Sequence, residues 1–289
     1  MSLLRRIGGC AAAVLAFAGL AQAVLAAPPR NWQMNLNEPA SPTMERIVEF
    51  HNLLLVVITL ISVFVLALLL YVMFRFSEKR NPTPSKTTHN TVLEVLWTTI
   101  PVIILVIIAI PSFKLLYYAD RVENADMTLK AIGRQWYWSY EYPDNGNFTF
   151  DSVLVADEDL EDGQPRLLTP DNMVVVPVNT KVRLLVTASD VLHSFALPAL
   201  GVKLDAVPGR INETWFEVTR EGTYYGQCSE ICGTGHAYMP IAVKAVSKAE
   251  FERWVAKAKE EFARVDAPEA TTHLAQVGTQ STAEAASAN

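Results

Sequence analysis

The chain has 289 residues with 30 acidic and 24 basic side chains, and its net charge of −6 argues against nucleic acid as a partner. Three cysteines are too few for a disulfide scaffold. Hydrophobic residues, 51% of the total, concentrate in three apolar blocks before residue 114. We therefore expect membrane segments first and a part of ordinary soluble composition after them.

The first apolar block has the pattern of a secretory signal peptide, which we assign to residues 1–26. Arg5 and Arg6 form a charged start, residues 10–20 are apolar, and two small-residue cleavage options follow. Cys10 comes before the apolar region, whereas a lipoprotein cysteine would follow it. A signal peptide implies that the bulk of the chain lies outside the cytoplasmic membrane.

The next two apolar blocks predict a transmembrane helical hairpin over residues 47–118, after an extended outer segment at 27–46. Residues 52–74 and 95–113 carry no charge, and a membrane-spanning helix needs about 20 such residues. A buried soluble hairpin is the alternative. The loop between the blocks has four basic residues against Glu78, so the positive-inside bias makes this loop cytoplasmic.

Residues 126–247 read as a β-sandwich. Short runs of β-type residues at 173–178, 182–186 and 241–246 are separated by Gly, Pro and Asn. Residues 248–265 predict an amphipathic surface helix, and residues 266–289 a disordered tail. The predicted fold class is a membrane-anchored all-β protein, with a two-helix hairpin ahead of the sandwich.

A cluster of soft metal ligands lies at residues 228–239. This loop contains Cys228, Cys232, His236 and Met239, and His193 lies 35 residues before the first cysteine. Thiolate, imidazole and thioether favour copper over magnesium or calcium. A disulfide, a zinc site and a single blue copper are alternatives. The second cysteine is surplus for one copper, which favours two copper ions bridged by both sulfurs.

The motif Cys-Ser-Glu-Ile-Cys-Gly-x-x-His-x-x-Met, with Asp-Val-Leu-His upstream, resembles subunit II of haem–copper cytochrome c oxidases. The resemblance covers roughly residues 44–260 and includes the segments at 135–142 and 205–210. It implies a cupredoxin-like copper A domain that accepts electrons from cytochrome c and passes them to haem in subunit I. Oxygen is reduced to water and protons are pumped there, so this chain would be one subunit of a proton-translocating oxidase.

The resemblance also implies a ligand set. Cys228 and Cys232 would bridge both copper ions, His193 and Met239 would complete one, and His236 with the backbone carbonyl of Glu230 the other. The Glu230 side chain would bind a magnesium ion shared with subunit I, because a carboxylate oxygen suits that hard cation. An ordinary loop carboxylate is the alternative for Glu230.

An aromatic run at residues 136–142 has five aromatic side chains in seven positions. A strand with large residues on both faces accounts for most of them. The resemblance implies that the electron enters at Trp136. The family commonly has His where this chain has Arg134, a positive charge that would weaken docking of a basic partner locally.

An acidic balance distinguishes the outer domain, since residues 126–247 contain 16 acidic and nine basic side chains. Such a surface attracts a basic redox protein, and the resemblance makes cytochrome c the candidate. Glu141, Asp171 and Asp190 are the predicted docking residues, whereas the acidic run at 157–162 is either a further patch or a solvated loop. No Cys-x-x-Cys-His occurs, so the chain is expected to carry no haem.

Glu94 is the one acidic residue between the basic loop and the third apolar block. It either favours a helix N-terminus or, as the resemblance implies, stands at the cytoplasmic mouth of a proton path into subunit I. The expected setting is a bacterial inner membrane, with the copper domain in the periplasm and oxidase subunits I and III beside the hairpin. The rivals are a copper-delivery module, a copper-free quinol-oxidase subunit and a nitrous oxide reductase.

Overall fold

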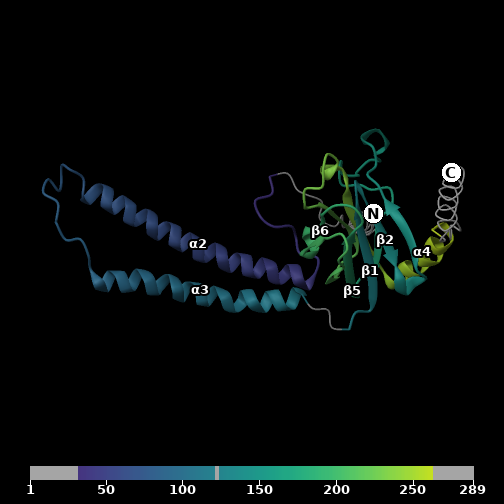
Figure 1. Ribbon diagram of the computed structural model, residues 1–289, viewed down its shortest axis with the longest axis horizontal. Helices are drawn as coiled ribbons and strands as arrows, with labels where there is room; N and C mark the ends of the chain where they lie inside the picture. The colour runs from purple at the N-terminus through teal and green to yellow at the C-terminus, as the bar shows by residue number, and fades with distance from the viewer. Residues whose placement is uncertain (1–31, 121–123, 263–289) are drawn as a thin grey trace, which may run out of the picture.

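The computed structural model describes residues 32–120 and 124–262. The predicted signal peptide and tail lie outside the described residues. The elements, labelled as in Figure 1, are α2 Pro42–Arg75, α3 Thr91–Asp120, β1 Met127–Arg134, β2 Tyr137–Tyr142, β3 Phe148–Ser152, β4 Val174–Pro177, β5 Lys181–Ala188, β6 His193–Leu197, β7 Val202–Ala206, β8 Asn212–Glu217, β9 Gly222–Cys228, β10 Pro240–Val246 and α4 Lys248–Glu261. Short 3₁₀ turns η1 Pro143–Asn145, η2 Asp157–Asp159, η3 Pro198–Leu200 and η4 His236–Tyr238 interrupt the loops.

The hairpin helices α2 and α3 are longer than the uncharged blocks within them. Helix α2 begins at Pro42, inside the segment predicted to be extended through residue 46. Ser41 explains this earlier start, because its side chain accepts a hydrogen bond from the Met44 N–H at 3.0 Å and Pro42 supplies the fixed φ of a first helical turn. Helix α3 continues through Pro101 and Pro111 to Asp120.

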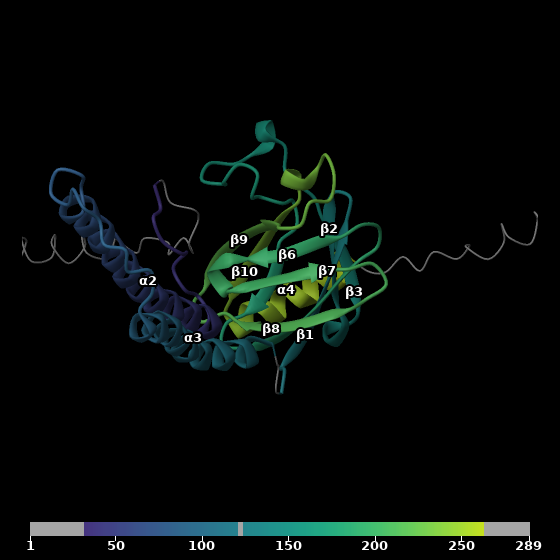
Figure 2. The ribbon, with the colours of Figure 1, turned by 60° about the vertical axis from the view of Figure 1, so that its left-hand side comes forward.

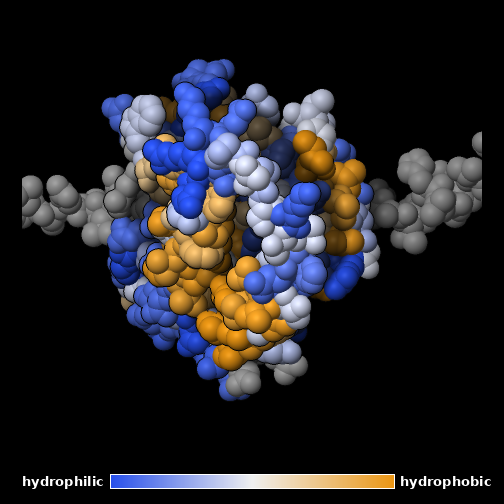
Figure 3. All heavy atoms as spheres, turned by 90° about the vertical axis from the view of Figure 1, so that its left-hand side faces the viewer, coloured by the Kyte–Doolittle hydropathy of each residue, from blue (hydrophilic) through white to orange (hydrophobic). Residues whose placement is uncertain are grey.

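The central turns of both helices expose their apolar side chains. Within the part of the chain that the structure describes, α2 and α3 are the two helices long and apolar enough to cross a membrane. Figure 3, viewed from the side of the hairpin loop, shows hydrophobic side chains gathered over the helices. These faces suit contact with lipid or with other membrane helices.

The domain after the hairpin is a sandwich of two five-stranded sheets in the described residues. Their strand orders are β3-β2-β1-β5-β8 and β4-β10-β9-β6-β7, and Figure 2 shows β6, β7, β9 and β10 together. Strands β1 and β5 alternate buried and half-buried residues over eight positions each. That period of two follows from side chains pointing to opposite faces, so each strand buries one face. The sandwich confirms the predicted fold class.

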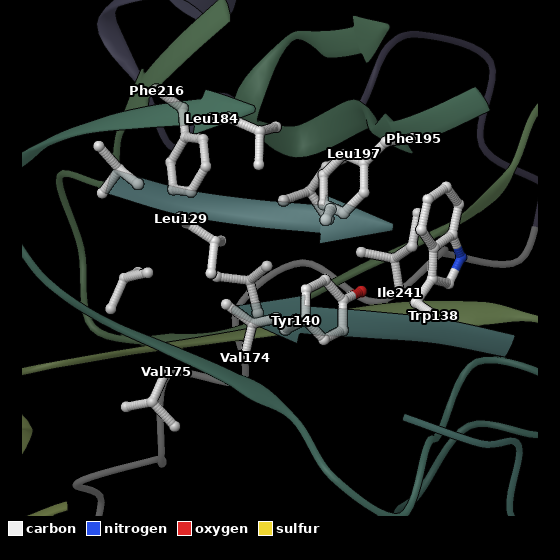
Figure 4. Close-up of a cluster of buried hydrophobic side chains, with 14 of the residues drawn as sticks. Leu129, Trp138, Tyr140, Val174, Val175, Leu184, Phe195, Leu197, Phe216 and Ile241 are labelled. Carbon is white, nitrogen blue, oxygen red and sulfur yellow. The ribbon is translucent and has the colours of Figure 1, made fainter. Parts of the chain in front are cut away.

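The core lies between the two sheets (Figure 4). Aromatic and aliphatic side chains from both sheets fill it, among them Leu129, Trp138, Tyr140, Leu184, Phe195, Leu197, Phe216 and Ile241. Burying each of these side chains contributes about 1.5–3 kcal/mol. In the aromatic run, Trp138, Tyr140 and Tyr142 are fully buried, so these three residues are core residues of β2.

The hairpin and the sandwich are joined by polar contacts. The Trp215 indole donates a hydrogen bond to the Tyr118 carbonyl at 3.0 Å, at the end of α3. Within the hairpin, the Arg46 guanidinium of α2 lies 3.6 Å from the centre of the Tyr118 ring of α3 and so holds the two helices together at this end. The Ser41 hydroxyl donates to the Leu200 carbonyl at 2.7 Å. Figure 1 shows the hairpin projecting from one end of the sandwich, with α4 at the other.

Candidate metal centre

The soft ligands lie where β9 ends and β10 begins. Cys228 is the last residue of β9, Cys232 lies in the following loop, His236 opens the turn η4, and Met239 immediately precedes β10. Strands β9 and β10 pair antiparallel, from Gln227 opposite Pro240. The loop is therefore held at both ends by one sheet, which brings its four ligand side chains to the same pole.

The His193 side chain reaches this loop from the neighbouring strand. Strand β5 stops at Ala188, and His193 is the first residue of β6. Strand β6 pairs with β9 through Phe195 opposite Cys228. Continuing that antiparallel register places His193 beside the start of the metal loop.

Two sulfur atoms are at the centre of the ligand cluster. The sulfurs of Cys228 and Cys232 are 4.0 Å apart, and both residues are free thiols. The Cys228 sulfur lies 3.9 Å from Nδ1 of His193 and 3.3 Å from the Glu230 carbonyl oxygen. The Cys232 sulfur lies 3.6 Å from Nδ1 of His236. It is also 3.6 Å from the Met239 sulfur.

These distances fit metal ions held between the thiols. A thiolate sulfur binds zinc at about 2.3 Å. At a bond length of that order, one ion can contact both sulfurs, which are 4.0 Å apart. Each sulfur has its own imidazole and one further soft or oxygen donor nearby. The donor set therefore fits two soft ions between two shared sulfurs, and His193, Cys228 and Cys232 are all buried.

The two thiols have opposite tendencies to ionise. Burial raises the pKa of the Cys228 thiol, but hydrogen bonds from His193 and from nearby backbone outweigh it, and the net shift is downward. Burial and the adjacent Cys228 charge together raise the pKa of Cys232. The second negative charge is thus costly beside the first, and a cation between the sulfurs would remove that cost.

The His193 imidazole is confined by close packing and has a contact at each ring nitrogen. Its Nε2 lies 2.9 Å from Oδ1 of Asp190, which leaves Nδ1 facing the Cys228 sulfur. Trp138 packs edge-on against the ring with centroids 6.1 Å apart. A Cβ atom at Gly133 would lie 2.8 Å from the imidazole. A carboxylate on the second nitrogen orients a metal-binding histidine and makes it more basic.

Trp136 lies against the metal loop. Its indole Nε1 donates to the Cys232 carbonyl at 3.1 Å. A Cβ atom at Gly235 would lie 2.3 Å from the indole ring, so the loop backbone runs directly beneath it. Trp136 is half-buried, which leaves part of the ring at the surface next to a ligand residue.

The predicted docking acids have different surroundings. Asp190 hydrogen-bonds the metal-facing His193, as well as the backbone N–H groups of Gln135 and Val191 at 2.7 Å. Glu141 forms an ion pair with Lys130 at 2.9 Å, so its charge is partly offset. Asp171 accepts from the Val153 N–H at 2.8 Å and remains exposed.

Glu94 lies in the first turn of α3, far along the hairpin from the sulfur cluster (Figure 1). It accepts a hydrogen bond from the Asn90 N–H at 3.3 Å, and Asn90 Oδ1 accepts from the Leu93 N–H at 3.2 Å. This reciprocal pattern caps the helix N-terminus.

Sequence reasoning missed the supporting role of Asp190, Trp138, Gly133 and Gln135. The position of Asp190 three residues before a ligand histidine was a usable signal, because carboxylates commonly support such histidines. Trp138 donates to the Met239 carbonyl at 3.4 Å from 101 residues away. No local pattern indicates a contact across that separation.

Together, the apolar hairpin, the sandwich and the sulfur–imidazole cluster define a membrane-anchored metal-binding β domain. The family model for cytochrome c oxidase subunit II, periplasmic domain, matches residues 127–246, and the model for the transmembrane domain of the same subunit matches residues 29–115.

Two relatives named as the same subunit match most of this chain. A probable cytochrome c oxidase subunit 2 of Rickettsia prowazekii (strain Madrid E) is 55% identical over 231 residues, or 80% of this chain and 74% of that protein. Cytochrome c oxidase subunit 2 of Oenothera berteroana is 54% identical over 230 residues, or 78% and 89%. The crystal structure of the periplasmic domain of subunit II of Bradyrhizobium japonicum cytochrome oxidase is 58% identical, with a TM-score of 0.47 over 49% of this chain and 99% of that one.

The chain belongs to the cytochrome c oxidase subunit II family. It is a membrane-anchored subunit of a haem–copper oxidase and associates with other oxidase subunits. Family membership implies a copper A centre, and the His193, Cys228 and Cys232 cluster is where the structure gathers suitable donors.

Proposed function

We propose that residues 228–239 and His193 bind two copper ions that share both cysteine sulfurs, and that the chain accepts electrons there from a cytochrome c for delivery to haem in subunit I. One observation carries the proposal: two buried sulfurs 4.0 Å apart, each with its own imidazole nitrogen within 3.9 Å. When bound, such a copper pair supplies a one-electron acceptor whose charge is spread over two ions.

The ligands are assigned to the two ions by residue. His193 and Met239 would complete one ion, and His236 with the Glu230 carbonyl would complete the other. All four donors lie within 3.9 Å of a cysteine sulfur, which supports the donor set. The division of the donors between the two ions is the one that the family resemblance implies. The buried His193 and Met239 exclude water on one side, while the Asp190 carboxylate holds the His193 ring in place.

Copper content tests the shared-sulfur arrangement. We expect the copper content of the purified oxidase to fall by two ions in Cys232→Ser relative to wild type, because each thiolate would serve both ions. Ser229→Ala, in the same loop, is the control and should keep the wild-type copper content. A fall of one copper ion or none in Cys232→Ser would favour a single blue copper and contradict the proposal.

Trp136 is proposed as the residue through which the electron enters. Its hydrogen bond to the Cys232 carbonyl and its half-exposed ring support this role. We expect Trp136→Phe to slow electron uptake from reduced cytochrome c while copper content stays unchanged. Uptake at the unaltered rate would remove Trp136 from the path.

The acidic outer surface is proposed to dock cytochrome c. The excess of acidic residues over residues 126–247 and the exposure of Asp171 support this role. Asp190 adds charge beside the metal loop, whereas Glu141 lies further along β2 and is offset by Lys130. Docking through charge predicts association that slows as ionic strength rises, whereas salt-independent association would contradict it.

The Glu230 side chain is proposed to bind a magnesium ion shared with subunit I. The Glu230 carbonyl is already beside the Cys228 sulfur, which leaves the hard carboxylate for a hard cation. Glu230→Gln should lower magnesium content in the assembled oxidase and leave copper content unchanged. Unchanged magnesium would favour an ordinary loop carboxylate.

Glu94 is proposed to stand at the cytoplasmic mouth of a proton path, and helix capping is the second candidate. The hydrogen bond with Asn90 favours capping. Glu94→Gln separates the two, because glutamine keeps the acceptor oxygen but cannot carry a proton. Slower proton uptake with a stable oxidase would support the proton role, and unchanged turnover would favour the cap.

The proposed topology puts the sandwich in the periplasm of a bacterial inner membrane and residues 76–90 in the cytoplasm, beside subunits I and III. Basic residues at 79, 80 and 86 support this orientation. An impermeant thiol reagent should label Ser85→Cys from the cytoplasmic side. Labelling from the outer side would contradict the topology.

A further inference from the structure

A two-residue turn joins β1 to β2 at the pole of the sandwich that carries the metal loop. Arg134 and Tyr137 are the last paired residues of the two strands, so Gln135 and Trp136 form the tip between them. The tip is not an isolated surface turn, because both residues contact the loop that follows β9. The position of the Trp136 side chain therefore depends on the contacts that hold this tip in place.

Gln135 connects the tip to both halves of the metal centre. Its side-chain amide donates to the Cys232 carbonyl at 2.8 Å, and its backbone N–H donates to Oδ2 of Asp190 at 2.7 Å. The other oxygen of Asp190 lies 2.9 Å from Nε2 of His193. Gln135 is thus one hydrogen bond from Cys232 and two from His193.

The Cys232 carbonyl accepts from both residues of the tip. The Gln135 amide lies 2.8 Å from this oxygen and the Trp136 indole nitrogen 3.1 Å. A carbonyl oxygen has two lone pairs, so the two donors use its full capacity. Gly233, the next residue, leaves the two donor side chains little room to move. A Cβ atom at this position would lie 3.0 Å from the indole and 3.3 Å from the Gln135 amide nitrogen.

We propose that Gln135 is a positioning residue for electron transfer, holding the tip so that the Trp136 indole stays against the ligand loop. The inference rests on the proposed role of Trp136. Gln135 itself receives no electron, and its amide acts only through the geometry of the tip. The transfer moves one electron from the reduced donor haem to the oxidised metal centre, without transfer of a proton or formation of a bond.

Positioning and docking predict different kinetics. Electron transfer within the donor complex depends on the gap between the indole and the ligand loop, whereas donor affinity depends on surface charge. Loss of the amide donor would let the tip move without changing net charge. A positioning role therefore lowers the first-order transfer rate at saturating donor and leaves donor affinity unaltered.

The test uses the assembled oxidase with cytochrome c, measuring the first-order transfer rate, the donor Kd and copper content. Gln135→Leu removes the amide, and Gln135→Lys restores an N–H donor at similar length. Trp136→Phe is the reference variant. Gln164→Leu, which alters a glutamine in the loop before β4, is the matched control.

Gln135→Leu should lower the first-order rate about fivefold, the change that loss of one hydrogen bond permits. Donor Kd and copper content should stay unchanged, and Gln164→Leu should transfer at the wild-type rate. Gln135→Lys should recover most of the first-order rate while its added positive charge weakens donor binding.

Three results would overturn the proposal. The first is a wild-type first-order rate in Gln135→Leu when Trp136→Phe is slow, since the tip would not need the amide. The second is an effect confined to Kd, which would make Gln135 a docking residue. The third is loss of copper in Gln135→Leu, which would make it a structural support of the metal loop. A wild-type rate in Trp136→Phe would instead remove the proposed electron path, and the Gln135 proposal with it.

Discussion

The two histidines of the metal centre are held in different ways. His193 begins a strand, is fully buried, and is contacted by Trp138, Asp190 and the backbone at Gly133. His236 lies in a short turn of an exposed loop and is half-buried. One side of the centre is thus built into the sandwich core, and the other lies at the surface beside Trp136.

The His193 side is therefore suited to holding the metal, and the side beside Trp136 is suited to exchanging electrons. A ligand fixed by packing and a carboxylate keeps its geometry without the metal, because its surroundings determine its orientation. A ligand on an exposed loop is accessible to a partner and depends more on the bound metal for its order. We expect substitutions on the His193 side to affect stability and copper binding, and those on the Trp136 side to affect electron uptake.

The largest expected contrast is between His193→Ala and His236→Ala in the metal-free protein. His193→Ala removes a buried ring and its hydrogen bond with Asp190, which should cost about 2–4 kcal/mol of unfolding free energy. His236→Ala should cost less than about 1 kcal/mol, as for other half-exposed positions. Thermal unfolding of the two metal-free variants measures the difference. Equal losses would show that the two sides are equally rigid.

A second contrast uses two glycines whose Cβ atoms would meet different side chains. Gly133→Ala places a Cβ atom 2.8 Å from the His193 ring, so overpacking should cost about 1–3 kcal/mol and lower copper content. Gly235→Ala places a Cβ atom 2.3 Å from the half-exposed Trp136 ring. It should slow electron uptake at normal copper content, because the indole must move. If Gly235→Ala lost as much copper as Gly133→Ala, the proposed division between a metal-holding His193 side and an electron-exchanging Trp136 side would be contradicted.

The smallest expected contrast is between Asp190→Asn and Asp171→Asn. Each removes one negative charge, so both should slow association with a basic donor about twofold to threefold at low salt. Asp190→Asn should also lower copper affinity about tenfold, because the asparagine cannot support His193 as a carboxylate does. Copper titration against a competing chelator distinguishes the two. If Asp190→Asn and Asp171→Asn bound copper with the same affinity, Asp190 would act only in docking and would not support His193.

The metal ligands were predictable from the sequence because most of them lie in one loop. Cys228, Cys232, His236 and Met239 are close in sequence, and their chemistry restricts the possible metals. The hairpin was likewise predictable, since 23 and 19 uncharged residues have few other interpretations. The predicted sandwich followed from short β-type runs separated by turn residues.

The supporting contacts were not predictable because they join distant segments. Gln135 meets Cys232 across 97 residues, and Asp190 meets the backbone of Gln135 across 55. The pairing of Glu141 with Lys130 depends on the register of β1 and β2, in which they are opposite one another.

The central claim is that two copper ions share the sulfurs of Cys228 and Cys232. Electron paramagnetic resonance of the oxidised, purified oxidase tests it directly. One unpaired electron divided equally between two copper nuclei gives a seven-line hyperfine pattern, which we predict for the wild-type chain. A four-line pattern from a single copper, or no copper signal from a chain with its ligands intact, would contradict the account.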